Sequence, residues 1–310
     1  MTLLVSIFNW DFHGYRIRVF LDILFAVANN ACIGGYRNMI KLRSDIFTIL
    51  VILFLIIMFS SCSGSPALTL TTPITSPVAA PAPTVQIQWL GQSCFLITSS
   101  QGTRILTDPP VASTGYVIAP MDGIDAVTVS HEHTDHNNVG LASGNPLILR
   151  GLTSSGWNTV DQRIKDVHIY SISPAYPIFH DNVQGAQRGR NSIFILEMDG
   201  LRIAHLGDLG HILTTESIQA LGKLDAVLVP VGGTYTIDAA VATQVVNLLN
   251  PGIAIPMHYK TSKVPATWPG TGVEPFLDGK KLVERPNSSI IKLSQTTLPS
   301  QTTVVVLNLE

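Results

Sequence analysis

The stretch VTVSHEHTDHNNVG, Val127 to Gly140, opens as an apolar run and then places three histidines and two acids within six residues. Side chains two positions apart at the end of a strand point to the same side, so His131 and His133 can reach one metal ion together. Asp135 and His136 follow on the turn that leaves the strand, where they can reach a second ion. Burying these ligands together needs a cation to offset their desolvation, and Zn²⁺ favours imidazole and carboxylate. The stretch therefore predicts a metal site for two ions.

The spacing His-x-His-x-Asp-His resembles the ligand motif of the metallo-β-lactamase fold hydrolases. That family uses three later ligands, and the chain offers His180 in YPIFHDN, Asp208 in AHLGDLGH and His258 in IPMHYKT, in the expected order. The resemblance implies that Asp208 bridges two metals and that the other ligands divide into two sets. These sets are His131, His133 and His180 for the first metal, and Asp135, His136 and His258 for the second. We expect Zn²⁺, although Mn²⁺ or Fe²⁺ suits the same ligands.

Further segments look like one branch of this superfamily, which contains ascorbate-6-phosphate lactonase and relatives of N-acyl phosphatidylethanolamine phospholipase D. The matching segments are WLGQSCFLI, ILTDP, RGRNSIF, HLGDLGH, PVGGTYTID and IPMHYKT. The resemblance covers nearly all of residues 85–310 and departs at Gln92, where the branch usually has histidine. It implies an α/β fold, a four-layer αββα sandwich of two mixed β-sheets with outer helices and the site at one sheet edge.

The chemistry implied is hydrolysis by a water shared between two ions about 3.5 to 4 Å apart, which loses its proton near neutral pH and attacks an ester-type bond. A lactone or a phosphodiester is the expected substrate, and Asp135 or Asp208 is the expected proton acceptor. His133 is retained where the flavodiiron variant has glutamate, which favours hydrolysis over redox chemistry. The alternative is a non-catalytic, metal-binding envelope lipoprotein, because a metal site alone does not establish catalysis. A bridging Asp208 favours the enzyme, since a structural zinc site is closed by four ligands.

Several polar residues outside the ligand set are candidates for contacts around the site. Guanidinium groups at Arg188 and Arg190 can bind phosphate or carboxylate, although charges in a loop can also simply face water. His205 and His211 flank Asp208, so we expect them to hydrogen-bond a ligand or line the pocket, with a purely structural role as the alternative. The full set of candidate substrate contacts is Arg188, Arg190, Asn191, Tyr235 and Lys260.

The N-terminal part differs from the rest of the chain. IFTILVILFLIIMF, Ile46 to Phe59, is an uncharged apolar run, shorter than the roughly 20 residues of a membrane span but of a length suited to a signal-peptide core. Lys41 and Arg43 precede it, and FSSCSGS follows. Segment 39–61 thus resembles a bacterial lipoprotein signal in which Cys62 is lipidated. An uncleaved anchor is the alternative, and either one predicts a location in the bacterial cell envelope, facing the periplasm or the exterior.

The remaining boundaries follow from composition. Residues 1–38 precede the signal without a readable purpose, so we interpret them as an upstream extension outside the natural protein. Segment 62–84 is rich in Pro, Ser, Thr and Ala and predicts an extended linker. The hydrolase domain is expected over residues 85–310. Cys94 is the one cysteine in that domain, which excludes a disulfide framework there, and we expect it to be a buried apolar residue.

Charge limits the partners of the chain. The 310 residues carry a formal net charge of -2, which provides no basic field of the kind that nucleic acids need. A hydrophobic share of 46% is enough for a sizeable core. The expected partners are a small-molecule or lipid-derived substrate and a membrane that holds the N-terminal anchor.

Short strands dominate the predicted secondary structure. One helix is expected over 237–249, capped by Thr236 and with Val241, Val245, Leu248 and Leu249 on its apolar face. A weaker helix is expected over Thr215 to Leu221. The predicted strands are 85–90, 94–98, 104–108, 125–130, 192–198, 201–207, 225–231, 252–257, 289–293 and 303–309.

Overall fold

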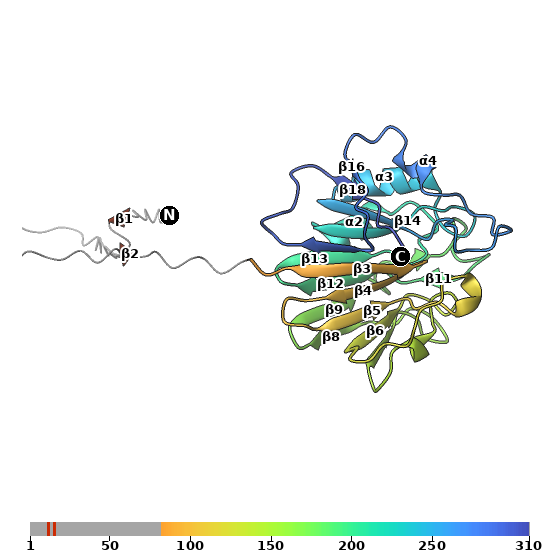
Figure 1. Ribbon diagram of the computed structural model, residues 1–310, viewed down its shortest axis with the longest axis horizontal. Coiled ribbons are helices and arrows are strands. Elements are labelled where there is room, and N and C mark those ends of the chain that lie inside the picture. The colour runs from red at the N-terminus through yellow and green to blue at the C-terminus, as the bar shows by residue number, and fades with distance from the viewer. Residues whose placement is uncertain (1–10, 13–14, 17–81, 310) are drawn as a thin grey trace, which may run out of the picture. The chain divides into compact units, whose positions relative to one another are not determined.

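The computed structural model describes residues 11–12, 15–16 and 82–309. The predicted signal segment, Cys62 and the linker as far as residue 81 lie outside the described residues. The chain divides into two units, Met1–Pro77 and Val78–Glu310. In the first unit β1 (Asp11–Phe12) pairs antiparallel with β2 (Tyr15–Arg16). The second unit holds all the other described elements (Figure 1).

The larger sheet of the second unit is mixed. Its strands are β8 (Asp161–Ile164), β9 (Val167–Ser171), β12 (Phe194–Met198), β13 (Leu201–His205), β14 (Ala226–Pro230), β15 (Ile253–Met257), β16 (Val283–Glu284) and β18 (Thr303–Val305). They lie in the order β16-β18-β15-β14-β13-β12-β9-β8. Pairing is parallel from β16 to β13 and antiparallel from β13 to β8. β14 and β15 are buried at every residue, as parallel strands covered on both faces should be.

The smaller sheet is also mixed. Its strands are β3 (Val85–Gly91), β4 (Cys94–Thr98), β5 (Arg104–Thr107), β6 (Ala126–Val129), β7 (Leu147–Arg150) and β17 (Ile290–Leu293). They lie in the order β17-β3-β4-β5-β6-β7, with β5, β6 and β7 parallel and the other pairs antiparallel. Burial alternates along β3, because successive side chains of a strand point to opposite faces.

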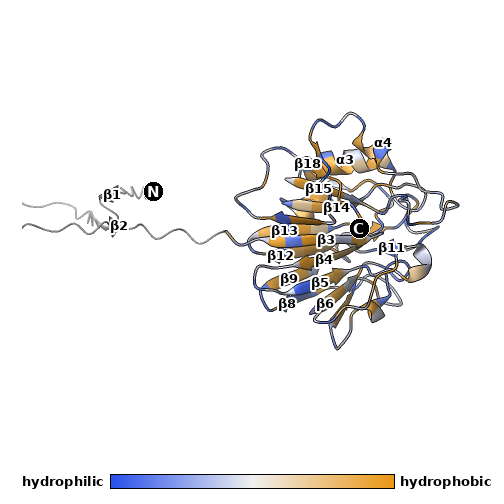
Figure 2. Ribbon diagram, in the orientation of Figure 1, coloured by the Kyte–Doolittle hydropathy of each residue, from blue (hydrophilic) through white to orange (hydrophobic). Residues whose placement is uncertain are grey.

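The two sheets enclose the main core, and most of their strands are apolar (Figure 2). Phe95, Ile97 and Ile105 of the smaller sheet belong to the same buried cluster as Phe194 and Ile203 of the larger one. The opposite face of the smaller sheet forms a second cluster, made of Cys94, Leu96, Leu106, Val127 and Val129 with Ile124, Leu141 and Ala142 from the following loops. The alternation of side chains along β4 and β5 thus assigns one apolar row to each cluster.

The fold class is confirmed, but the helical cover is smaller than expected. The described helices are α2 (Thr215–Leu221), α3 (Ala239–Leu249), α4 (Glu274–Leu277) and the short 3-10 turns η1 (Ala112–Thr114) and η2 (Val139–Leu141). α3 packs against β14 of the larger sheet, whereas η2 and loop residues pack against the outer face of the smaller sheet (Figure 1). Within the described ranges, every helix lacks the length and apolar character needed to cross a membrane.

The predicted bounds of α2 are confirmed, while those of α3 are wrong at its start. Asp238 caps α3, because its carboxylate accepts a hydrogen bond from the backbone N–H of Val241 at 2.8 Å, so the helix begins two residues later than expected. The buried face consists of Ala242, Val245, Val246 and Leu249, so Val245 and Leu249 are buried as predicted. Leu248 is 49% exposed.

All ten predicted strands are present, each within three residues of its predicted limits except at the end of 303–309. The prediction missed β7, β8, β9 and β16, and also the short pair β10 (Ile178–Phe179) and β11 (Arg190–Asn191). β8 carries three exposed residues out of four at the edge of the larger sheet, so it lacks an apolar pattern to detect.

Candidate metal centre

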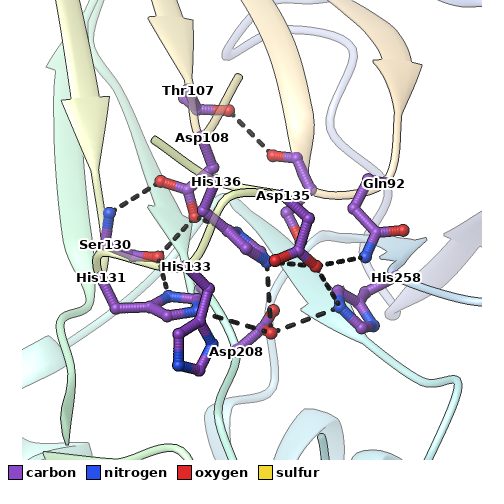
Figure 3. Close-up of polar contacts among 12 residues, drawn as sticks. Gln92, Thr107, Asp108, Ser130, His131, His133, Asp135, His136, Asp208 and His258 are labelled. Atoms are coloured by element: carbon purple, nitrogen blue, oxygen red, sulfur yellow. Dashed lines mark hydrogen bonds and ion pairs between the residues drawn. The ribbon is translucent and has the colours of Figure 1, made fainter. Parts of the chain in front are cut away.

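The seven predicted ligand side chains gather where strands end. Figure 3 shows six of them, and His180 joins the same cluster beside His131 and His133. β6 ends at Val129, just before His131, and β10 ends at Phe179, just before His180. Asp208 and His258 follow β13 and β15 of the larger sheet in the same way. Because carboxyl ends of parallel strands meet at one edge of a sheet, residues up to 127 positions apart become neighbours.

The ligand atoms form two adjoining groups. His131, His133 and His180 make up one group, and Asp135, His136, Asp208 and His258 make up the other. Within each group the candidate ligand atoms lie within 4.8 Å of one another. The grouping matches the division into two metal sets that the sequence resemblance implies, with Asp208 between them.

One oxygen of Asp208 occupies the centre of the cluster. Its Oδ2 lies 3.0 Å from His180 Nε2 and 3.8 Å from His131 Nε2, both of the first group. The same oxygen lies 3.2 Å from His136 Nε2 and 3.3 Å from His258 Nε2, both of the second group. A single carboxylate thus faces imidazole nitrogens of both groups, which is the arrangement that a ligand shared by two ions requires.

The polar atoms of the cluster fit a metal centre. Buried polar atoms in proteins normally have hydrogen-bond partners, since leaving one without a partner costs about 1 to 3 kcal/mol. Six buried atoms of the cluster have none: His136 Nε2, both ring nitrogens of His180, both ring nitrogens of His258, and Asp208 Oδ1. Divalent cations bind neutral imidazole and carboxylate at these very atoms, so the residues present suit the group that the fold implies.

Electrostatics within the cluster lead to the same conclusion. Burial raises the pKa of Asp208, but the histidines His136, His258 and His180 outweigh it and hold that pKa well below its usual range. Burial lowers the pKa of His258, but Asp208 and Asp135 raise it to about 9. Burial and the neighbouring His136 lower the pKa of His131. The carboxylates therefore favour the protonated form of His258 when no metal is bound. His131 stays neutral, which is the form that binds a metal ion.

Asp108 holds Ser130 and His136 in place beside the cluster, a role that the sequence analysis did not predict. It follows β5, and its Oδ1 accepts the backbone N–H of Ser130 at 2.7 Å while its Oδ2 accepts the Ser130 hydroxyl at 2.5 Å. The same Oδ2 lies 2.9 Å from His136 Nδ1, which fixes the ring so that Nε2 faces Asp208. Ser130 Oγ lies 3.0 Å from His131 Nδ1. The segment ILTDP contains Asp108, yet nothing in its spacing separates this acid from any other after a strand.

Gln92 connects ligands that come from the two sheets. Its side-chain Nε2 donates to Asp135 Oδ2 at 3.0 Å, and its backbone carbonyl accepts the His258 N–H at 3.2 Å and the indole N–H of Trp89 at 3.0 Å. Gln92, Asp108 and His258 have left-handed backbones, with φ of 52°, 39° and 50°. Such conformations cost about 1 to 3 kcal/mol for residues other than glycine and concentrate at functional sites.

Asn191 is not placed for a substrate contact, contrary to expectation. It is fully buried, its Nδ2 donates to the Leu206 carbonyl at 2.9 Å, and its Oδ1 accepts the backbone N–H of Asp208 at 3.0 Å. Gly207 precedes Asp208 with φ of 54°, and a Cβ there would lie 2.4 Å from Asn191 Oδ1. The amide of Asn191 therefore holds the turn that presents Asp208.

His205 and His211, which flank Asp208 in the sequence, hydrogen-bond to backbone atoms of residues next to the proposed ligands. His205 is fully buried, and its Nε2 lies 2.8 Å from the Ser93 carbonyl, while its Nδ1 accepts the N–H of Gly207 at 3.2 Å. His211 Nε2 accepts the N–H of Phe179, directly before His180, at 3.1 Å. Both rings therefore hold ligand-bearing turns and do not bind the ligand side chains themselves.

The remaining candidates separate into different surroundings. The Arg188 guanidinium lies 5.5 Å from the centre of the Tyr235 ring, whereas that of Arg190 lies 5.2 Å from the Trp157 ring. Lys260 Nζ donates to the backbone carbonyls of Ala266 and Trp268, so its charge fixes a loop. Cys94 is fully buried, and burial with the nearby Asp108 raises the pKa of its thiol well above the usual value, as suits a structural residue.

Comparison with known proteins identifies the family. The model of the beta-lactamase superfamily domain matches residues 86–258. A UPF0173 metal-dependent hydrolase of Pyrococcus abyssi is 30% identical over 220 residues, which is 64% of this chain and 92% of the relative. That of Archaeoglobus fulgidus is 31% identical over 198 residues, or 57% and 84% of the two chains.

Solved structures agree with this result. A Thermotoga maritima protein, described as a Zn-dependent hydrolase of the metallo-beta-lactamase superfamily, has a TM-score of 0.57 and 33% identity over 73% of this chain and 100% of its own. A metal-dependent hydrolase structure from Parabacteroides distasonis, with a TM-score of 0.52, 19% identity and coverage of 74% and 94%, shares the fold. The chain belongs to the beta-lactamase superfamily and, within it, to the UPF0173 metal-dependent hydrolases.

Proposed function

We propose that this member of the UPF0173 metal-dependent hydrolases is a binuclear enzyme. His131, His133 and His180 hold one ion, Asp135, His136 and His258 hold the other, and Asp208 is shared. The observation that carries the proposal is the position of Asp208 Oδ2, within 3.0 to 3.8 Å of imidazole nitrogens from both groups. Zn²⁺ is the expected metal, because imidazole and carboxylate are its preferred ligands outside thiolate sites.

When bound, two divalent ions supply a water of lowered pKa and Lewis-acid polarisation of the scissile group. The protein's own residues hold the ligands and manage the proton. Asp208 is 2% exposed at its side chain, whereas Asp135 is 29% exposed. Asp135 is therefore the ligand carboxylate with access to solvent, which suits it to pass a proton outward, while Asp208 stays enclosed. The Gln92 amide keeps Asp135 in this orientation by donating to the same Oδ2.

The substrate is proposed to be an ester-type compound, a lactone or a phosphodiester, that reaches the exposed side of the cluster. His133 is the exposed ligand and Asp135 is half-buried, whereas the other five ligands are buried. Substrate entry from the side of His133 and Asp135 is the arrangement that this burial supports. The finer likeness to the lactonase and phospholipase D branch is part of this proposal.

Anchoring in the bacterial cell envelope is proposed from the N-terminal sequence. The run Ile46 to Phe59 followed by Cys62 supports a lipoprotein signal. Expression of the full chain with labelled palmitate tests this part. Label should enter the native chain and be lost in Cys62→Ser, and equal labelling of both would contradict a lipid on Cys62.

Elemental analysis of the full chain, combined with a hydrolysis screen over lactones, phosphodiesters and β-lactams, tests the central function. We expect near two metal ions per chain and an activity that chelation removes and Zn²⁺ restores. An activity that survives complete chelation would contradict the metal-dependent mechanism. One ion per chain, without turnover of any substrate class, would instead favour a metal-binding lipoprotein.

A further inference from the structure

A row of three side chains leads from the protein surface to the ligand His258. The Arg188 guanidinium lies 5.5 Å from the centre of the Tyr235 ring, the Tyr235 ring lies 6.1 Å from that of Trp268, and the Trp268 ring lies 5.8 Å from that of His258. Arg188, Tyr235 and Trp268 come from three separate loops. Their alignment brings one positive charge and two aromatic faces to the side of the metal ligand.

The loop that carries Arg188 is fixed to the metal centre. Asp181 directly follows the ligand His180 and is 3% exposed. Its carboxylate accepts four backbone N–H groups at 2.7 to 3.0 Å, from Val183, Gly185, Gln187 and Arg188. A buried carboxylate that binds four backbone groups closes the loop around itself. The backbone of Arg188 is therefore held in a defined position relative to His180.

The loops that carry the two aromatic residues are fixed to each other. Lys260 Nζ donates to the carbonyls of Ala266 at 2.7 Å and Trp268 at 2.9 Å. The Thr271 N–H donates to the Gly232 carbonyl at 2.8 Å, which joins the Trp268 loop to the Tyr235 loop. At Gly270 a Cβ would lie 2.0 Å from the Trp268 ring, so only glycine admits this ring position. The aromatic surface is thus formed in advance, which limits the entropy lost on binding.

The charge of Arg188 is available to a ligand. Arg150, Arg202 and Arg285 each pair with a glutamate at 2.6 to 2.9 Å. Across residues 82–309, no carboxylate oxygen lies within ion-pair distance of the Arg188 guanidinium, whose one recorded partner is the Tyr235 ring. A planar guanidinium of this kind binds carboxylate or phosphate through paired hydrogen bonds.

We propose that Arg188, Tyr235 and Trp268 form a recognition subsite for anionic substrates. The carboxylate or phosphate group of the substrate binds Arg188, and the planar or apolar segment that joins this group to the scissile bond lies along Tyr235 and Trp268. The proposal rests on the proposed hydrolase function for its biological meaning, but the subsite itself is a binding site that exists with or without turnover.

Isothermal titration calorimetry on the full chain tests the subsite with phenyl phosphate, benzoate, benzyl alcohol and inorganic phosphate. Arg188→Gln should weaken binding of the better-bound aromatic anion about tenfold or more, because it removes a charge-assisted hydrogen bond. Binding of benzyl alcohol should be unchanged. The comparison of phenyl phosphate with benzoate decides whether phosphate or carboxylate is the preferred group.

Two matched variants separate this role from general charge or packing effects. Arg190→Gln removes the same charge two residues away and should change the affinity of either anion less than about twofold, since Arg190 lies over Trp157. Trp268→Ala should weaken the binding of phenyl phosphate but not that of inorganic phosphate, because inorganic phosphate has no ring to stack on the indole. Equal losses in Arg188→Gln and Arg190→Gln, or no loss in either, would overturn the subsite.

The outcome for the subsite is independent of the outcome for the enzyme. If an ester is hydrolysed, Arg188→Gln should raise KM for its anionic forms and leave kcat nearly unchanged. If no ester is hydrolysed but the difference in binding between the two arginine variants persists, the subsite stands and the proposed function is wrong. If turnover is found and both arginine variants bind the anions alike, the function stands and the subsite is wrong.

Discussion

Asp108 and Asp208 are two buried aspartates at the ends of two strands, β5 and β13, one from each sheet. Their exposures are 0% and 1%, so burial does not distinguish them. Both oxygens of Asp108 accept hydrogen bonds, from the N–H and the hydroxyl of Ser130, and Oδ2 also lies 2.9 Å from His136 Nδ1. At Asp208, by contrast, Oδ1 has no partner, and Oδ2 faces four imidazole nitrogens.

The difference between the two aspartates separates a residue that positions a ligand from a residue that is itself available to bind metal. Asp108 belongs with the scaffold, because the protein already satisfies it and because it orients a ligand ring. Within residues 82–309, the Asp208 oxygens accept no hydrogen bond from the backbone or from a hydroxyl group, so they are available to bind a cation. Asp108 also lies close enough to His131 and His136 to share an ion with them. Its complete set of hydrogen bonds is the reason to assign it to support instead of metal binding.

The largest effect is expected at Asp208. Asp208→Asn keeps the shape but removes the shared anionic ligand, so activity should fall by about a thousandfold or more, as loss of several kcal/mol of metal-based stabilisation implies. Elemental analysis of this variant should show fewer than two ions, with an unchanged circular dichroism spectrum. Full activity in Asp208→Asn would remove the distinction drawn between the two aspartates.

Asp108→Asn should act on the scaffold first. Loss of a charge-assisted bond to Ser130 or His136 should lower the free energy of unfolding by about 1 to 3 kcal/mol and weaken metal binding about 10- to 100-fold. Denaturant unfolding of the chelated chain measures the first effect and competition with a zinc indicator the second. If the chelated variant unfolds like the native chain, Asp108 is not a structural support.

Gln92→Ala should distinguish the two groups of ligands. The Gln92 amide donates to Asp135 of the second group and to no residue of the first group. The variant should therefore lower the affinity for the ion of the second group about tenfold and leave the affinity for the other ion unchanged. A two-step zinc titration resolves this. Gln92→His serves as the control, because imidazole can restore a donor, and equal weakening of both ions in the alanine variant would contradict the assignment.

Metal removal should reverse the dependence of stability on pH. His258 has a folded pKa of about 9, above the value of 6.5 for a free histidine, so its contribution is present below pH 6.5 and is lost as pH rises through 9. His131 and His133, whose pKa values are lowered, oppose this trend only near pH 6.5, where unfolded histidine is still partly protonated. The Tm of the chelated chain should therefore fall by several degrees from pH 6.5 to 9.

The zinc-loaded chain should behave in the opposite way over the same range, because ligands must lose protons to bind metal. Differential scanning fluorimetry of both forms in matched buffers measures the two slopes. A chelated chain whose Tm rises from pH 6.5 to 9 would show that the carboxylates do not hold a proton on His258.

The smallest effect is expected at Glu132, which lies between two ligands in sequence but outside the site. Its carboxylate pairs with Arg150 at 2.6 Å, and both side chains are exposed, at 45% and 40%. Glu132→Gln should change activity less than about twofold and stability by less than about 0.5 kcal/mol. Steady-state kinetics and thermal unfolding test this, and a loss approaching that of Asp208→Asn would mean that the motif was assigned incorrectly.

The seven side chains that the sequence proposes as ligands lie together in the structure, and they could be proposed because their spacing is short and chemically distinctive. His131 to His136 forms a local pattern, and His180, Asp208 and His258 each follow an apolar segment that reads as a strand. The sheet then brings them together. Asp108 offers no such pattern, since it is one acid after one strand, and its role depends on contacts with Ser130 and His136 that only the fold creates.

Errors elsewhere have similar physical causes. Asn191 carries no local sign that its amide holds the Asp208 turn, because the contact spans 17 positions. The start of α3 was predicted from Thr236 as the cap, but the carboxylate of Asp238, two residues later, caps the helix. Edge strands such as β8 lack the apolar alternation that identifies buried strands.

Anomalous diffraction at the zinc edge, from crystals of the zinc-loaded chain, would show directly whether Asp208 is shared by two ions. We expect two peaks about 3.5 to 4 Å apart, both within bonding distance of the Asp208 carboxylate at about 2.0 to 2.2 Å, and none bonded to Asp108. A single peak, or a peak bonded to Asp108 in place of Asp208, would contradict this expectation.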